Sequence, residues 1–113
     1  MPEQGTQILV VEDQSGLREG LVEWLSRKIG DMHMHVDDVE GGKDAISTLQ
    51  RAEVEYDAVL LDKVLPDIDG LEVLQQIKKL DSDLPVIMFT GKDPKAGIQA
   101  LQQGAYRYLS KPI

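Results

Sequence analysis

The chain of 113 residues contains no cysteine, so neither a disulfide nor a cysteine-ligated zinc site can form. It has no apolar run close to the ~18 residues that a membrane-spanning helix needs. Residues 1–6 are polar and lack the basic and apolar segments of a secretion signal. Basic residues are also scarce, with 12 Lys and Arg against 20 Asp and Glu. Because phosphate backbones attract basic surfaces, we expect a single cytoplasmic domain that binds neither membrane nor nucleic acid directly.

Short apolar runs alternate with amphipathic stretches of helical length along the whole chain. This alternation predicts a parallel α/β sheet whose strands are joined by right-handed helical crossovers. Trp24, in the first amphipathic stretch, is expected to pack on the sheet rather than stack against a ligand. The expected strands are about 7–12, 32–36, 58–61, 86–89 and 106–110, and the expected helices are about 15–29, 41–51, 70–80 and 94–103.

Polar side chains stand at the ends of four of these apolar runs. They are Glu12 and Asp13, Asp62, Thr90 and Lys111. Each alone has an ordinary explanation, such as a helix cap or a surface charge. Because ligands bind outside the carboxyl ends of parallel strands, we expect the five to converge on one edge of the sheet. Their joint placement therefore predicts a functional site.

The chemistry of these groups suits a divalent cation and a phosphoryl group. Asp13 and Asp62 can bind Mg²⁺ directly, with Glu12 acting through a water molecule. A carboxylate beside Mg²⁺ stays ionised and can attack phosphorus, which would give an aspartyl phosphate. Lys111 can supply an ammonium and Thr90 a hydroxyl to the charge that develops on the transferring group.

Two other metal-binding patterns compete with this interpretation. Residues 67–70, DIDG, resemble part of an EF-hand loop, but the first and twelfth ligand positions would be Leu65 and Gln76. Asp67 and Asp69 are therefore expected to be turn and helix-start residues. His33 and His35 would share one face of a strand, but no third zinc ligand is evident nearby. We expect them on an exposed edge strand.

Taken together, these motifs resemble the receiver domains of two-component response regulators. The resemblance runs from Ile8 to Pro112. Residues 8–13, ILVVED, resemble the first strand and acidic pair of the family, and residues 56–62, YDAVLLD, with Pro66 and residues 69–70 resemble its phosphoacceptor segment. Residues 89–91 and 111–112 resemble its hydroxyl and lysine motifs. The resemblance implies a flavodoxin-like, doubly wound, five-stranded parallel sheet in the order 2-1-3-4-5.

The resemblance also implies a function for the site. Asp62 would receive a phosphoryl group from a phosphohistidine on a sensor histidine kinase or a phosphotransfer protein. Mg²⁺ would be bound by Asp13, Asp62 and the backbone carbonyl of Val64, with Glu12 in the outer shell. Such a domain is a signalling switch rather than an enzyme, and catalyses only its own phosphorylation and dephosphorylation.

Two further residues would relay the phosphorylated state. The resemblance implies that Thr90 and Lys111 contact the phosphoryl group. Tyr108, three residues before Lys111, matches the switch aromatic of the family, which turns inward as the Thr90 hydroxyl shifts. The signal would then pass from Thr90 and Tyr108 to a partner or to an output domain outside this chain.

The chain departs from the family pattern at its end and beside the site. Only Pro112 and Ile113 follow Lys111, so we expect a single receiver domain over residues 1–113, truncated before its fifth helix. The apolar surface left uncovered would favour self-association. Val64 and Lys92 occupy positions that tune the lifetime of the phosphoryl group in the family.

Two other functions compete with the phosphorylated switch. One is a protein-interaction module with the same fold that is not phosphorylated. The other is a phosphatase or phosphotransferase that acts on a small molecule through an aspartyl phosphate. That second class usually needs another Asp two residues after the nucleophile as a general acid. Val64 stands at that position, which argues against it.

Overall fold

In a computed structural model of the protein, residues 5–27, 34–51, 53–91 and 94–110 are described. Strands and helices alternate along the chain as the hydrophobic pattern predicts. The strands are β1 (Thr6–Val11), β2 (Met34–Val39), β3 (Ala58–Asp62), β4 (Val86–Thr90) and β5 (Arg107–Ser110). The helices are α1 (Ser15–Arg27), α2 (Gly42–Arg51), α3 (Gly70–Leu80) and α4 (Pro94–Gln102).

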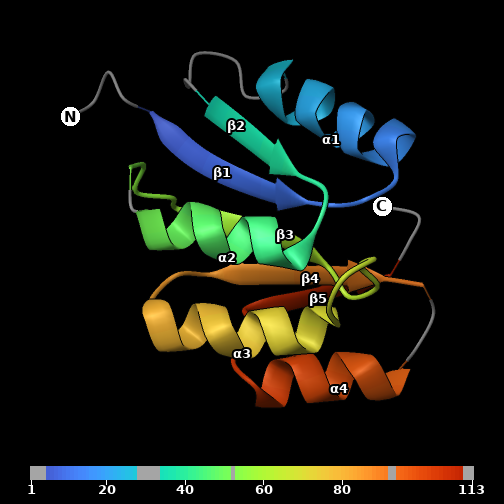
Figure 1. Ribbon diagram of the computed structural model, residues 1–113. Helices are drawn as coiled ribbons and strands as arrows, with labels where there is room; N and C mark the ends of the chain where they lie inside the picture. The colour runs from blue at the N-terminus through green and yellow to red at the C-terminus, as the bar shows by residue number, and fades with distance from the viewer. Residues whose placement is uncertain (1–4, 28–33, 52, 92–93, 111–113) are drawn as a thin grey trace.

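The five strands form one parallel sheet in the order β2-β1-β3-β4-β5, which confirms the predicted topology (Figure 1). The register decides where the functional side chains emerge. Val11 at the end of β1 pairs with Leu61 of β3, and Asp62 pairs with Phe89 of β4. The residues that follow Val11 and Leu61 therefore leave the sheet side by side at its carboxyl edge.

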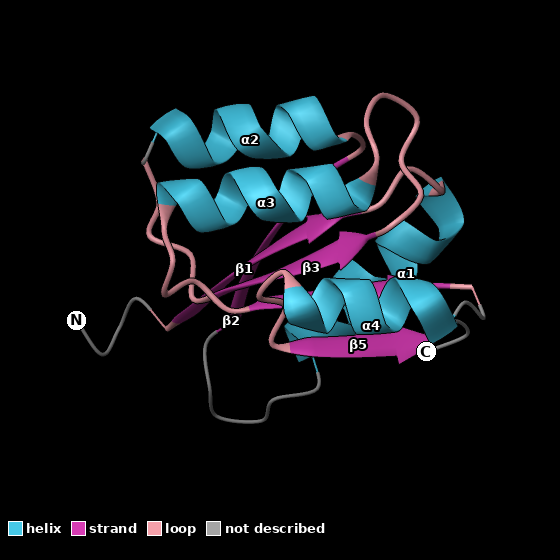
Figure 2. Cartoon of the chain, turned by 90° about the horizontal axis from the view of Figure 1, so that it is seen from below, coloured by secondary structure: helices cyan, strands magenta, loops and turns pink. Residues whose placement is uncertain are grey.

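Helices α2, α3 and α4 cover one face of the sheet (Figure 2). The amphipathic pattern of α3 explains its place, because Val73, Leu74 and Ile77 fall on one side and are fully buried. They meet alternate strand residues whose side chains point to this face. The buried cluster between helices and sheet includes Leu9, Val11, Ala45, Ile46, Val59, Leu61, Val73, Leu74, Ile77, Leu84, Val86, Met88, Ala100 and Ala105.

Helix α1 lies on the opposite face, next to β1 and β2 (Figure 1). Burial on this face is uneven across the sheet. Val10 of β1 is fully buried, its neighbours Leu60 and Ile87 are half-buried, and Leu109 of β5 is 42% exposed. Coverage of this face is therefore complete at Val10 and Phe89 and incomplete at Leu60, Ile87 and Leu109.

The expectation that Trp24 packs on the sheet is wrong, because its side chain is 51% exposed. Within the described residues, α1 is the only helix on its face. A ring at the flank of its apolar stripe therefore has no neighbouring helix to pack against. The first helix was predicted to continue to Ile29, and residues 28–30 lie outside the described residues.

The strand β2 runs to Val39, past its expected end at about residue 36, and its expected start at residue 32 lies outside the described residues. It is an edge strand, and His35 on it is exposed, in agreement with the edge-strand interpretation. His33 lies outside the described residues. Across the part of the chain that the structure describes, no helix has the length and apolar character needed to cross a membrane.

Candidate phosphoacceptor site

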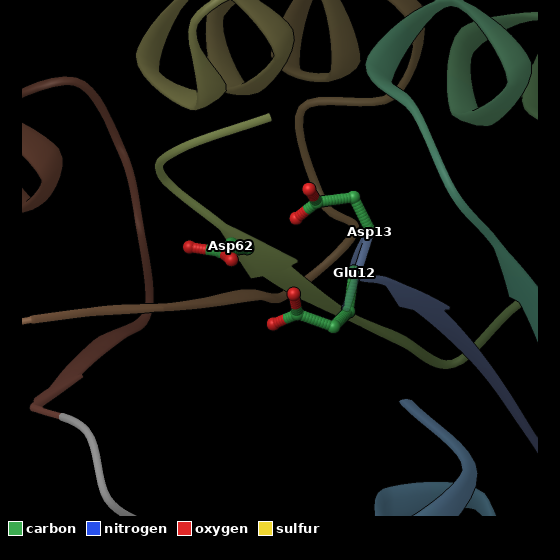
Figure 3. Close-up of side chains that lie close together, drawn as sticks. All are labelled: Glu12, Asp13 and Asp62. Atoms are coloured by element: carbon green, nitrogen blue, oxygen red, sulfur yellow. The ribbon is translucent and has the colours of Figure 1, made fainter. Parts of the chain in front are cut away.

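Three carboxylates meet at the carboxyl edge of the sheet. Figure 3 shows Glu12 and Asp13, which follow β1, beside Asp62 at the end of β3. One carboxylate oxygen from each residue lies within 4.8 Å of the others. Glu12 is 0% exposed and Asp62 is 2% exposed, whereas Asp13 faces solvent. The predicted convergence of these three side chains is thus observed.

The backbone around Glu12 holds it in place at the end of β1. The Glu12 N–H donates to the carbonyl of Val39 over 3.1 Å, which continues the pairing with β2 by one residue. The Glu12 side chain folds back, and its Oε2 accepts from the Gln14 N–H over 2.9 Å. This turn directs both acidic side chains away from the strand and toward Asp62.

The loop after Asp62 is equally constrained. The Val64 N–H donates to Asp62 Oδ1 over 3.1 Å, and the Gly70 N–H donates to the Lys63 carbonyl over 2.7 Å. A Cβ at Gly70 would lie 2.4 Å from the Asp62 carbonyl oxygen and 2.5 Å from Lys63 Cα. Since neither backbone atom can yield easily, only glycine allows α3 to start this close to the acidic residue.

Asp67 and Asp69 have structural tasks, which agrees with the rejection of an EF-hand loop. Asp69 caps α3, and its side chain accepts from the Leu71 N–H over 2.8 Å. Asp67 accepts from the N–H groups of Gly42 and Lys43 over 2.9 and 2.8 Å, and thereby caps α2 from a distant loop. The loop after Asp62 is thus fastened to α2 as well as to α3.

The pKa of Asp67 is lower than that of an ordinary aspartate. Desolvation acts in the opposite direction and raises this pKa, but the hydrogen bonds from Lys43, Gly42 and Ile68 outweigh it. These N–H groups favour the ionised form of the carboxylate. The sequence motif alone did not reveal this cap, because its donors come from a helix that begins 25 residues earlier.

The donor set at the edge fits Mg²⁺. Three carboxylates this close repel one another, and burying two of them adds a desolvation penalty unless a cation neutralises their charge. Mg²⁺ takes oxygen ligands and commonly binds through one or two carboxylates while it keeps several waters. The exposed Asp13 keeps one side of the cluster accessible to such a hydrated ion.

Two of the predicted site residues are described only in part or not at all. Thr90 ends β4, and its backbone is in register with Ser110 of β5. The Thr90 side chain and all of Lys111 lie outside what the structure describes, as does Lys92. Val64 is two residues after Asp62 and is 64% exposed.

Tyr108 of β5 lies between the sheet and α4. Its ring packs on the buried cluster, and its hydroxyl donates to the Gly91 carbonyl over 3.3 Å. A Cβ at Gly97 of α4 would lie only 2.7 Å from two carbons of this ring. Sequence reasoning missed Gly97, although a glycine inside a helix costs about 1 kcal/mol relative to alanine and so signals a close approach.

The fold and the acidic cluster define a class of protein: a doubly wound α/β domain with three converging carboxylates at the carboxyl edge of its sheet. Comparison with known sequences identifies the family. The sequence model of the response regulator receiver domain matches residues 8–113, and the chain belongs to this family. Receiver domains are the phosphoacceptors of two-component signal transduction, and they generally bind Mg²⁺ at an acidic pocket.

Curated relatives agree with this assignment. The chain is 41% identical over 108 residues to the transcriptional regulatory protein QseB of Haemophilus influenzae, covering 95% of this chain and 46% of QseB. It is 36% identical over 109 residues to the transcriptional regulatory protein ResD of Bacillus subtilis, covering 96% of this chain and 42% of ResD. The chain therefore spans less than half the length of these two relatives.

Solved structures of receiver domains have the same fold. A response regulator receiver domain from Clostridium thermocellum matches with a TM-score of 0.86 and 27% identity, covering 96% of this chain and 83% of that one. The non-phosphorylated HemR receiver domain from Leptospira biflexa matches with a TM-score of 0.82 and 30% identity, again over 96% and 83% of the two chains.

Proposed function

We propose that Asp62 is the phosphoacceptor of this receiver domain and that it takes the phosphoryl group from a phosphohistidine. The observation that carries the proposal is the placement of Asp62, which is 2% exposed at the end of β3 and shares a pocket with two other carboxylates. A sensor histidine kinase or a phosphotransfer protein would be the donor.

The residues around Asp62 would have separate roles in binding Mg²⁺. Asp13, Asp62 and the backbone carbonyl of Val64 would hold Mg²⁺, and Glu12 would act in its outer shell. The ion, when bound, would neutralise charge among the carboxylates and on the phosphoryl group. The hydrogen bond from the Val64 N–H to Asp62 Oδ1 supports this division, because it orients the carboxylate at the pocket.

Transfer would proceed by attack of an Asp62 carboxylate oxygen on phosphorus. A phosphorus–oxygen bond forms while the phosphorus–nitrogen bond of the donor breaks, and the electron pair stays on the imidazole nitrogen, which takes up a proton. Thr90 and Lys111 would donate to the phosphoryl oxygens. Positioning and charge stabilisation are the contributions that such a pocket makes to the reaction.

We further propose that Thr90 and Tyr108 report the phosphorylated state. Tyr108 supports this role because its hydroxyl bonds to Gly91, the residue after Thr90, while its ring rests on α4. A shift of the Thr90 segment would therefore displace the Tyr108 ring and change its contact with α4. Such a contact can bias two arrangements of the α4–β5 surface.

The signal would pass to an output segment outside this chain. Two of the relatives are named as transcriptional regulatory proteins, and this chain spans 46% and 42% of their lengths. We propose that residues 1–113 form the receiver unit of a longer regulator. Self-association through the incompletely covered face stays a prediction, as do the cytoplasmic location and the lack of direct nucleic-acid binding.

Phosphorylation of the isolated chain tests the assignment. The chain is incubated with Mg²⁺ and acetyl phosphate, and its intact mass is compared with those of Asp62→Asn and Asp83→Asn. Asp83 is an exposed aspartate in the turn after α3 and serves as the matched control. We expect the mass of one phosphoryl group on the wild type and on Asp83→Asn, and no adduct on Asp62→Asn.

Two results would contradict the proposal. An adduct on Asp62→Asn would place the acceptor elsewhere. A wild type without any adduct would instead favour the interaction module that is not phosphorylated.

A further inference from the structure

Arg18 of α1 is nearly enclosed behind the acidic turn, with its side chain 11% exposed. Arginine is rarely this buried unless its donors are paired. Its Nη1 donates to the carbonyl oxygen of Glu12 over 3.0 Å and lies 3.4 Å from that of Asp13. The guanidinium therefore contacts the backbone of both acidic residues of the pocket from the side of α1.

Two carboxylates orient the guanidinium from the other side. Its Nε donates to Asp38 Oδ2 over 2.9 Å, and its Nη2 donates to Glu40 Oε1 over 3.3 Å. Asp38 and Glu40 are 42% and 71% exposed, so these ion pairs add little to stability by themselves. They instead orient the guanidinium: because Nε and Nη2 are held by the carboxylates, Nη1 is directed at the turn between β1 and α1.

From this geometry we infer that Arg18 is a positioning residue for the metal pocket. The inference rests on the proposed function, because it concerns the binding of Mg²⁺ by Glu12, Asp13 and Asp62. Arg18 would hold the peptide groups of Glu12 and Asp13, and through them the directions of the two side chains. It touches neither the ion nor the phosphoryl group.

The acidic residues themselves create the need for a residue that holds their backbone in position. Without a cation, the three carboxylates repel one another and tend to separate. The Glu12 N–H is tied to Val39, but Asp13 is exposed and follows the end of the strand. Mg²⁺ demands near-octahedral geometry at short distances, so a displaced Asp13 would bind it less well.

Arginine suits this task better than lysine. Its planar guanidinium presents donors in a fixed fork, which can bond to two carbonyls and two carboxylates together. A lysine would keep the positive charge but would reach only some of these acceptors. The comparison of Arg18→Lys with Arg18→Met therefore separates a positioning role from a role of charge alone.

Calorimetric titration with Mg²⁺ tests the inference directly. The dissociation constant is measured for the wild type, Arg18→Lys, Arg18→Met and the matched pair Arg51→Lys and Arg51→Met. Arg51 also pairs with a carboxylate, that of Glu53, but it ends α2 and is 57% exposed. We expect both Arg18 variants to bind Mg²⁺ about tenfold more weakly, as loss of a residue that orients ligands typically does, and the Arg51 variants to match the wild type.

A second measurement separates positioning from a general loss of structure. Thermal unfolding without Mg²⁺ establishes that each variant is folded, and Arg18→Lys serves if Arg18→Met does not fold. The rate of phosphorylation by acetyl phosphate is then followed against Mg²⁺ concentration. We expect the half-saturating concentration to rise about tenfold in Arg18→Lys while the rate at saturation stays close to the wild type.

The outcomes distinguish this inference from the function on which it rests. Unchanged Mg²⁺ binding in folded Arg18→Lys and Arg18→Met would overturn the positioning role alone, with Asp62 still phosphorylated. Full recovery of affinity in Arg18→Lys would also overturn it, because charge would then suffice. A wild type that binds no Mg²⁺ and takes no phosphoryl group would overturn the proposed function and the inference together.

Discussion

The two faces of the sheet carry similar side chains, but the face under α1 is buried less evenly than the other. On the face covered by α2, α3 and α4, Leu61 and Met88 are fully buried. On the face covered by α1, the adjacent residues Leu60 and Ile87 are only half-buried. Leu60 and Leu61 are neighbours on β3, and Ile87 and Met88 are neighbours on β4. These neighbours are similarly hydrophobic, so hydrophobicity does not explain the difference in burial. Burial here depends on which helices stand over the residue.

The difference also separates strand residues that are fully covered from residues that stay partly exposed. Alternate residues of one strand belong to different environments because strand side chains alternate between faces. Leu109 of β5 is 42% exposed, and Trp24 of α1 is 51% exposed. Three substitution experiments can break or sharpen this comparison, and they follow in order of expected effect.

The largest effect is expected from truncation of a core leucine. Leu74→Ala should lower the free energy of unfolding by about 2–5 kcal/mol, because Leu74 is fully buried between α3 and the sheet. Leu109→Ala removes the same atoms from the open face and should cost less than about 1 kcal/mol. Urea unfolding of both variants measures the contrast. Equal losses would show that the open face is covered in solution.

An added methyl group probes how closely the helices pack. Gly97→Ala should cost about 1–2 kcal/mol, because the overlap of the new methyl with the Tyr108 ring exceeds the gain in helix propensity. Gly20→Ala on α1 is the matched control, since nothing lies within 4 Å of its Cβ position. That change should stabilise the protein by up to about 1 kcal/mol.

A double-mutant cycle attributes the Gly97 effect to the ring. If the overlap with Tyr108 is the cause, Gly97→Ala should cost less in a Tyr108→Ala background than in the wild type. An identical cost in both backgrounds would show that another contact of α4 is responsible. Urea unfolding at a single pH measures all four chains.

The smallest effect is expected from the polar cap on α2. Asp67→Asn should lower stability at pH 7 by about 1 kcal/mol, since an amide oxygen replaces the charged acceptor of the first-turn N–H groups. The folded pKa of Asp67 is depressed, so its stabilisation is fully present above the ordinary value of 3.8. It is lost as the pH falls below that value and through the folded pKa.

Stability measured against pH checks the sign of this prediction. The difference between wild type and Asp67→Asn should be constant near neutral pH and should vanish in acid. Asp83→Asn, an exposed change in the turn after α3, should show no such dependence. A difference between wild type and Asp67→Asn that grows in acid would mean that the carboxylate does not act through its charge.

The regular elements could be predicted well because each has a local physical signature. Helix α3 runs over Gly70–Leu80 as expected, since its apolar spacing and the Asp69 cap both lie within a short segment. The end of β2 was predicted too early, because Asp37 and Asp38 interrupt the apolar pattern that marks a strand. The expected start of this strand, with His33, lies outside the described residues.

The site was predictable where it depends on strand ends. Glu12, Asp13 and Asp62 converge because parallel strands share a carboxyl edge, and this follows from the order of elements. Their roles in metal binding and phosphorylation stay predictions, as do those of Thr90 and Lys111. The contacts of Arg18 with the acidic turn and of Asp67 with α2 could not be predicted, because they join elements whose distance depends on packing.

The sequence by itself determined the alternation of strands and helices, the acidic residues at the carboxyl edge and the family to which the chain belongs. Periodicity and motifs depend on residues that lie close together in the sequence, and the position of strand ends depends on the order of the elements along the chain. Only the tertiary structure decided that Arg18 bonds to the backbone of the acidic turn, that Gly97 lies against the Tyr108 ring and that Trp24 is exposed. These facts depend on how helices lie over the sheet, because contact and exposure arise from distant parts of the chain brought together.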